Sequence, residues 1–359
     1  MKRAYVAIAA TVGLFALVQV GALALVQPFM DAGLQTVEDP SDPTNSLLYV
    51  AAILVATAVM LGAIKLGVDR LLQMLIVFAA VMLAFYVFSV VVPPAVTYAG
   101  LNVLAVLAAA AIGLGLLFYP EWYVIDTAGI VMGAGAAGLF GISFGLLPAL
   151  LLLVVLAVYD AVSVYGTEHM LTLASGAMDL RLPVVFVVPL TLSYSFLEAD
   201  GPAALADDEA ETDETAQGKA DVDDEAETDE TAQEADVDDD AATGEDADPD
   251  EEPDPFGRDA FFIGLGDAVI PTILVASAAF FQPGGAPLLS VPGIALTLPA
   301  LGAVVGTLAG LLTLMWMVLE GRAHAGLPLL NGGAIAGYLA GALLAGVAVV
   351  EALGVAPYL

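Results

Sequence analysis

Nine runs of apolar residues, each close to the length that a membrane-crossing helix needs, constrain this chain more than any other feature. A helix must offer about 20 apolar residues to cross roughly 30 Å of hydrocarbon, and 60% of the 359 residues are hydrophobic. The runs cover residues 4–26, 47–66, 71–92, 98–118, 124–143, 146–166, 260–281, 293–318 and 327–350. The sequence therefore predicts an all-α polytopic membrane protein with nine transmembrane helices.

The basic residues predict how these helices are oriented, because cytoplasmic loops retain Lys and Arg. If the N-terminus is cytoplasmic and nine helices alternate, every basic residue lies on the cytoplasmic side: Lys2, Arg3, Lys65, Arg70, Arg181, Lys219, Arg258 and Arg322. We therefore expect a multi-pass protein of the cell membrane with its N-terminus inside and its C-terminus outside.

Charge divides the chain into three parts. Residues 1–197 hold six of the expected helices, residues 260–359 hold three, and residues 198–259 carry 28 of the 41 acidic residues. Within this linker the stretch DDEAETDETAQ occurs at 207–217 and again at 223–233. A segment with such high net charge and few large apolar residues is expected to be a disordered cytoplasmic spacer. A regulatory or partner-binding tail is the alternative.

Composition also excludes several kinds of site. Eight Lys and Arg residues in a chain of net charge −33 argue against a nucleic acid partner. The absence of cysteine excludes disulfides, thiolate metal ligands and a cysteine nucleophile. The two histidines, His169 and His324, are too few and too separate for a metal centre. We therefore expect neither a metal nor a cofactor.

Two aspartates lie inside apolar runs, Asp160 in LLLVVLAVYDAVSVY and Asp267 in FFIGLGDAVIPTILVASAAFF. A charged side chain at membrane depth costs at least ~2.5–3.5 kcal/mol, so such a residue indicates a functional site. Counted at ~1.5 Å per residue, both carboxyl groups lie roughly 9–11 Å below the cytoplasmic surface. The acid at Asp126, beside Glu121 and Trp122, is instead expected at that surface.

Two carboxyl groups at one depth support more than one chemistry. Close carboxyls share a proton, so one can take a proton from water while its protonated neighbour polarises a peptide carbonyl. The same pair could relay protons or bind a cation in a transporter or a leak channel, or it could be structural. Burial alone leaves these possibilities open.

The residues around Asp267 favour a site for an unfolded peptide. Gly264 and Gly266 let another backbone approach closely. Pro271 lacks the N–H that would bond to the carbonyl of Asp267, which loosens the helix beside the acid.

Three short motifs stand in a fixed order along the predicted helices. They are Tyr159-Asp160 in the sixth, Gly264-Leu265-Gly266-Asp267 in the seventh, and Pro328-Leu329-Leu330 at the start of the ninth. In these motifs the chain resembles the presenilin and signal peptide peptidase family of intramembrane aspartyl proteases. The extension from Tyr159 to Tyr165, with His169-Met170 after it, looks like the archaeal members of that family. Leu329 stands where that family carries alanine, which leaves the detail of substrate docking open.

This resemblance implies a nine-helix, presenilin-like bundle that cleaves transmembrane proteins or signal peptides within the lipid bilayer. Asp160 and Asp267 would form the catalytic dyad. The residues that would bind the substrate are Tyr159, Gly264, Leu265, Gly266, Pro328, Leu329 and Leu330. Tyr159 also fits an interfacial aromatic, and Pro328 also fits the first turn of a helix.

Cleavage of a helix requires that it unwind locally, and residues 183–196 suggest how a substrate could be held. This stretch is β-branched and aromatic and too short to span the membrane. We expect it to offer a strand edge to the substrate, with an interfacial segment as the alternative.

The linker provides a first test of the division into three parts. Deleting residues 203–250 should leave proteolysis of a transmembrane peptide largely intact, because a solvated spacer contributes no contact to a buried site. Loss of all activity in a variant that still folds would contradict the spacer interpretation.

Overall fold

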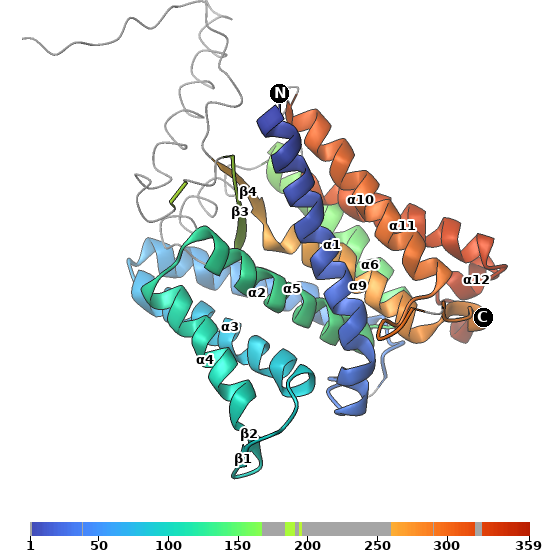
Figure 1. Cartoon of the computed structure of the whole chain (residues 1–359). Helices are drawn as coiled ribbons and strands as arrows, with labels where there is room; N and C mark the ends of the chain where they lie inside the picture. The colour runs from blue at the N-terminus through green and yellow to red at the C-terminus, as the bar shows by residue number, and fades with distance from the viewer. Residues whose placement is uncertain are drawn as a thin grey trace, which may run out of the picture.

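The computed structural model describes residues 2–37, 39–166, 184–190, 194–195, 260–289, 291–319 and 325–359. These residues form a helical bundle with a short two-stranded ladder toward each end (Figure 1). The fold is mostly helical, as expected, and it also contains these two small sheets. The linker 198–259 and both histidines lie outside the described residues.

The long helices follow the predicted apolar runs. They are α1 (Lys2–Asp31), α2 (Thr44–Lys65), α3 (Asp69–Val91), α4 (Val103–Phe118), α5 (Trp122–Ser143), α6 (Leu146–Gly166), α9 (Leu265–Phe281), α10 (Leu298–Leu319) and α11 (Gly326–Leu344). Within the described ranges, seven are long and apolar enough to cross a membrane, and α4 and α9 are apolar but shorter, with 16 and 17 residues. The chain beyond α11 forms the short helix α12 (Val349–Ala352) instead of continuing to residue 350.

Helix α9 lies at the centre of the bundle. It contacts α1, α5, α6, α10 and α11, and every residue from 271 to 279 is buried. Figure 1 shows α9 between α1 and α6, with α10 and α11 along one flank. A helix with protein on all sides needs no polar face, which is why this segment is apolar all round.

The first ladder explains why the fourth helix begins later than predicted. Strands β1 (Thr97–Tyr98) and β2 (Leu101–Asn102) pair as an antiparallel hairpin. Its two turn residues, Ala99 and Gly100, have φ of 50° and 81°, as a tight hairpin turn requires. The Asn102 side chain then accepts hydrogen bonds from the N–H groups of Leu104 and Ala105 and caps α4.

The second ladder corrects the start of the seventh helix. Strand β3 (Val185–Pro189) pairs antiparallel with β4 (Ala260–Gly264), so residues 260–264 are a strand rather than the first turns of that helix. The expected strand within 183–196 is thus confirmed over five residues. Its partner was missed, because a single apolar run does not show that its first residues bond to a distant segment.

Helices α10 and α11 pack through their glycines. A Cβ on Gly302 or Gly306 would overlap the carbonyl oxygen of Gly337 or Gly333, respectively, on the facing helix. The two backbones therefore approach more closely than any side chain would allow, as in other small-residue helix pairs of membrane proteins. This packing sets where α11 begins relative to its neighbours.

The glycine contact can be tested by a matched pair of substitutions. Gly306→Ala should lower the melting temperature in detergent, because overpacking typically costs about 1–3 kcal/mol. Gly332→Ala, on the exposed side of α11 where a Cβ meets nothing within 4 Å, should leave it unchanged or slightly higher. Equal melting temperatures for the two variants would contradict this packing.

Candidate functional site

The two membrane aspartates lie at the ends of adjacent helices. Asp160 is near the C-terminal end of α6 and is 7% exposed. Asp267 is the third residue of α9 and is partly buried. Helices α6 and α9 contact each other, and the carboxyl group of Asp160 acts electrostatically on that of Asp267. The expected convergence of these two groups is therefore observed, although Asp267 lies nearer its helix start than its apolar run suggested.

The start of α11 lies against both carboxyl groups. The backbone N–H of Leu327 donates a hydrogen bond to Oδ2 of Asp160, with an N···O distance of 3.0 Å. The neighbouring Gly326 faces Asp267, since a Cβ placed on it would lie 3.6 Å from Oδ2 of that aspartate. One dipeptide of α11 thus contacts acids carried by two other helices.

Gly264 encloses Asp267 from a third side. It ends β4 and caps α9, and a Cβ placed on it would lie 3.3 Å from Oδ2 of Asp267. That separation is tighter than an ordinary van der Waals contact, so a side chain at Gly264 would press on the carboxyl group. Because Gly264 has no side chain, the carboxyl group of Asp267 can keep its position.

A buried amide ties α11 to α6 further along both helices. Nδ2 of Asn331 donates to the carbonyl oxygen of Leu153 at 2.9 Å. Asn331 follows Leu327 by one helical turn, and Leu153 precedes Asp160 by two turns, so both contacts join the same pair of faces. The hydrogen bond from the Asn331 side chain and the hydrogen bond from the Leu327 backbone together fix the register of α11 against α6.

The remaining residues predicted to meet substrate are placed differently from one another. Tyr159 is 40% exposed, and Gly266 is exposed, with room for a Cβ that would make only an ordinary contact with Ile270. Leu265 lies beside Gly133 of α5, so its side chain is part of the packing. In Pro328-Leu329-Leu330 the proline is half-buried, Leu329 packs against a core cluster, and Leu330 is fully buried within it.

The expectation of a surface position for Asp126 is wrong. Asp126 is 7% exposed on α5, and its Oδ1 accepts a hydrogen bond from the N–H of Val187 in β3 at 2.8 Å. Asp126 does lie near the start of α5, but β3 covers this end of the helix. Sequence reasoning also missed Gly326, Leu327 and Asn331, whose roles depend on backbone groups and on contacts between distant segments.

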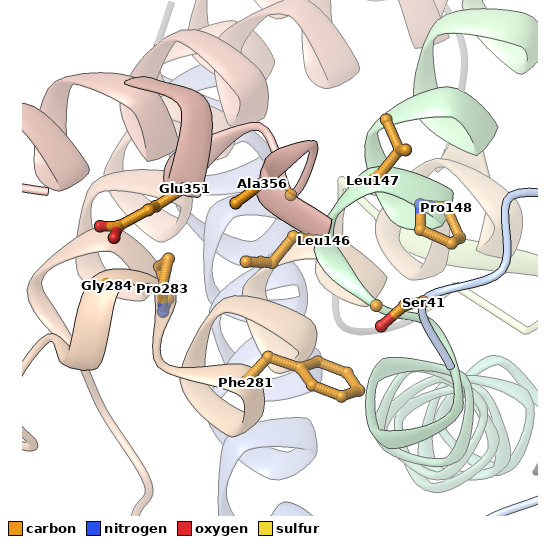
Figure 2. Close-up of a pocket in the computed structure, with 11 residues that line it drawn as sticks. Ser41, Leu146, Leu147, Pro148, Phe281, Pro283, Gly284, Glu351 and Ala356 are labelled. Atoms are coloured by element: carbon orange, nitrogen blue, oxygen red, sulfur yellow. The ribbon is translucent and has the colours of Figure 1, made fainter. Parts of the chain in front are cut away.

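One cavity lies away from Asp160 and Asp267, at the other end of the same helices. It encloses about 210 Å³ between the start of α6, the end of α9 and the C-terminal segment, as Figure 2 shows. Leu146 lines it, and 14 residues of α6 separate that residue from Asp160, or roughly 21 Å along the axis. This cavity therefore has no part in the aspartate site.

The site offers acid–base groups and backbone donors. Among the described residues, no group of three or more His, Asp or Glu side chains is placed to hold a metal ion. Two carboxyl groups beside each other can deprotonate a water molecule and protonate a carbonyl oxygen. The arrangement is suited to hydrolysis through an activated water.

Comparison with known proteins agrees with this chemistry. A family model described as "Signal-peptide peptidase, presenilin aspartyl protease" matches residues 12–347. A search of the curated proteins gave no match.

Two similar solved structures are described as a presenilin family intramembrane aspartate protease. The structure in space group C222 has 31% identity and a TM-score of 0.59, and the match covers 94% of this chain and 99% of that chain. The structure in space group P2 has 30% identity and a TM-score of 0.56, and the match covers 93% of this chain and 97% of that chain.

The contact between Gly264 and Asp267 predicts a kinetic defect. Gly264→Ala should move the carboxyl group by a few tenths of an ångström and lower kcat for a transmembrane peptide by about tenfold, since misplacing reacting groups by ~1 Å can cost about 100-fold. Gly332→Ala is the control, because its methyl group meets open space. A Gly264→Ala variant with wild-type kcat would show that the carboxyl group tolerates this methyl group.

Proposed function

The chain belongs to the signal-peptide peptidase and presenilin family of aspartyl proteases, and from this premise we propose that Asp160 and Asp267 are its catalytic pair. The protein is a multi-pass membrane protein and an intramembrane aspartyl protease. The observation that carries the assignment is the meeting of these two carboxyl groups at the start of α11.

Each carboxyl group has a role in the proposed reaction. One carboxylate takes a proton from a water molecule, whose oxygen then attacks the carbonyl carbon of the scissile peptide bond. The other, protonated, carboxyl group gives its proton to the carbonyl oxygen. When the tetrahedral intermediate collapses, the amine leaves with a proton returned by the pair. The Leu327 N–H holds Asp160 in one orientation during these steps.

The substrate is a transmembrane segment that unwinds to expose its peptide bonds. Leu265 N donates across the ladder to Val184 O at 2.8 Å, and backbone groups in antiparallel strands alternate between the two edges. Ala260 and Gly264 therefore direct their backbone groups away from β3, and this edge ends beside Asp267. A substrate strand added along β4 would bring its peptide bonds to the acids.

The expected strand edge thus moves from β3 to β4. The outer edge of β3 faces α5, where Asp126 bonds to Val187. In this arrangement Gly264 and Gly266 give the substrate backbone room, and Tyr159 lies at the exposed side of α6. Pro328, Leu329 and Leu330 approach the acids from the start of α11 and would contact the substrate there.

The topology proposed for this activity follows the basic residues. Nine helices cross the cell membrane with the N-terminus cytoplasmic and the C-terminus outside, and α4 and α9 serve as the two shorter spans. The acids then lie in the cytoplasmic half of the bilayer. Residues 198–259 form a cytoplasmic spacer between two membrane parts, 1–197 and 260–359.

Replacement of either acid tests the catalytic pair. Asp160→Asn and Asp267→Asn should each lower cleavage of a fluorogenic transmembrane peptide in detergent by at least roughly 10³-fold, because an amide can neither take nor give the proton. Asp31→Asn alters an exposed carboxylate at the far end of α1 and should retain full activity. Appreciable cleavage by either active-site variant would exclude that residue from the pair.

A further inference from the structure

A buried acid outside the catalytic pair supports the β3–β4 ladder. Oδ1 of Asp126 accepts a hydrogen bond from the N–H of Val187 at 2.8 Å. Asp126 lies on α5, which takes no part in the ladder. Val187 is paired with Phe262 on β4, and β4 continues directly into α9 and Asp267. This hydrogen bond therefore links α5 to β3, and β3 is paired with the strand that leads into Asp267.

The rest of this α5 face is shaped to receive β3. A Cβ on Gly129 would lie 2.8 Å from the ring of Phe186, so the glycine makes room for that side chain. Ile125 and Ala128 are buried in the same cluster as Val187. These apolar contacts seat the strand on the helix, but they do not fix its position along its own axis as a directional bond does.

Among the described residues, an open space adjoins Asp126 on one side. A cavity of about 230 Å³ lies between α1, α5 and β3, lined by Asp126, Val188, Pro189, Trp122 and four residues of α1. Side chains of α1 pack in one cluster with Phe186 and Val188 of β3, but they leave this space open beside the acid. A buried carboxyl group in an apolar surrounding is costly, and packing alone would be served better by an apolar side chain.

We propose that Asp126 is a positioning residue for proteolysis. Its bond to Val187 fixes β3, the ladder transmits this position to β4, and β4 sets the register of the substrate strand against Asp160 and Asp267. This role rests on the proposed catalytic pair and on substrate addition along β4. Only an acceptor oxygen is required at this position, so an amide can replace the acid.

The hydrogen bond can be removed from either side. Asp126→Ala removes the acceptor, and Asp126→Asn keeps an acceptor oxygen of similar placement. Val187→Pro removes the donor and spares the β3–β4 ladder, because that N–H bonds to α5 rather than to β4. Asp31→Ala, which removes an exposed carboxylate of α1 that accepts a bond from Gln27, is the control.

The measurement is cleavage of a transmembrane peptide in detergent, with kcat, KM and the cleaved bonds determined by mass spectrometry. Asp126→Ala and Val187→Pro should each lower kcat/KM by about tenfold or more and spread cleavage over neighbouring bonds, because the substrate register is loosened. The double variant should add little to either single change, since both remove one bond. Asp126→Asn and Asp31→Ala should keep the wild-type cleavage pattern.

Several results would overturn the proposal. An unchanged rate and pattern in Asp126→Ala would remove any positioning role. A lower rate with the wild-type pattern and a lower melting temperature would show that the acid only stabilises the fold. Impairment of Asp126→Asn equal to that of Asp126→Ala would show that an acceptor oxygen is not what matters. If Val187→Pro fails to fold, the difference in rate and cleavage pattern between Asp126→Ala and Asp126→Asn tests the proposal by itself.

The catalytic pair is tested separately on the same peptide. If cleavage persists in Asp160→Asn or Asp267→Asn, the proposed function fails whatever Asp126 does. If cleavage depends on both aspartates but Asp126→Ala is indistinguishable from wild type, only the positioning role fails.

Discussion

The contact on which this structure depends is the meeting of α6, α9 and α11 at two carboxyl groups. A carboxyl group inside an apolar bundle is costly unless polar partners surround it, and here one partner is a backbone N–H at the start of a helix. Leu327 supplies that group to Asp160, and Gly326 leaves space for Asp267. Because the first N–H groups of a helix have no partner within the helix, the start of α11 can serve the acid at no cost to its own hydrogen bonds.

Much of the remaining packing keeps α11 in that place. The glycines of α10 and α11 allow the two backbones to touch, and the Asn331 amide bonds to α6 further along. Helix α9 contacts five other helices, and its acid is partly buried. Contacts from the start of α11 and from Gly264 thus help two acids to remain close together in a surrounding that otherwise disfavours them.

In the proposed function, the small β3–β4 ladder offers the substrate a strand edge, which helices alone could not supply. A helix satisfies its own backbone groups, so it offers no edge for another chain. A strand offers one along its whole length, and β4 ends at Gly264, in contact with Asp267. The support of this ladder by α5 and Asp126 places the strand, the acids and the start of α11 in one arrangement.

The sequence by itself determined the positions of the apolar helices and identified Asp160 and Asp267. Apolar length and the cost of burying a charge are properties of a local segment, and they can be read without knowing what the segment touches. Only the tertiary structure decided that residues 260–264 form a strand, that Asp126 is buried, and that Leu327 and Asn331 hold α11. Each of these depends on a backbone group or a polar side chain meeting a partner far away in the chain, and the order of residues alone does not specify such a partner.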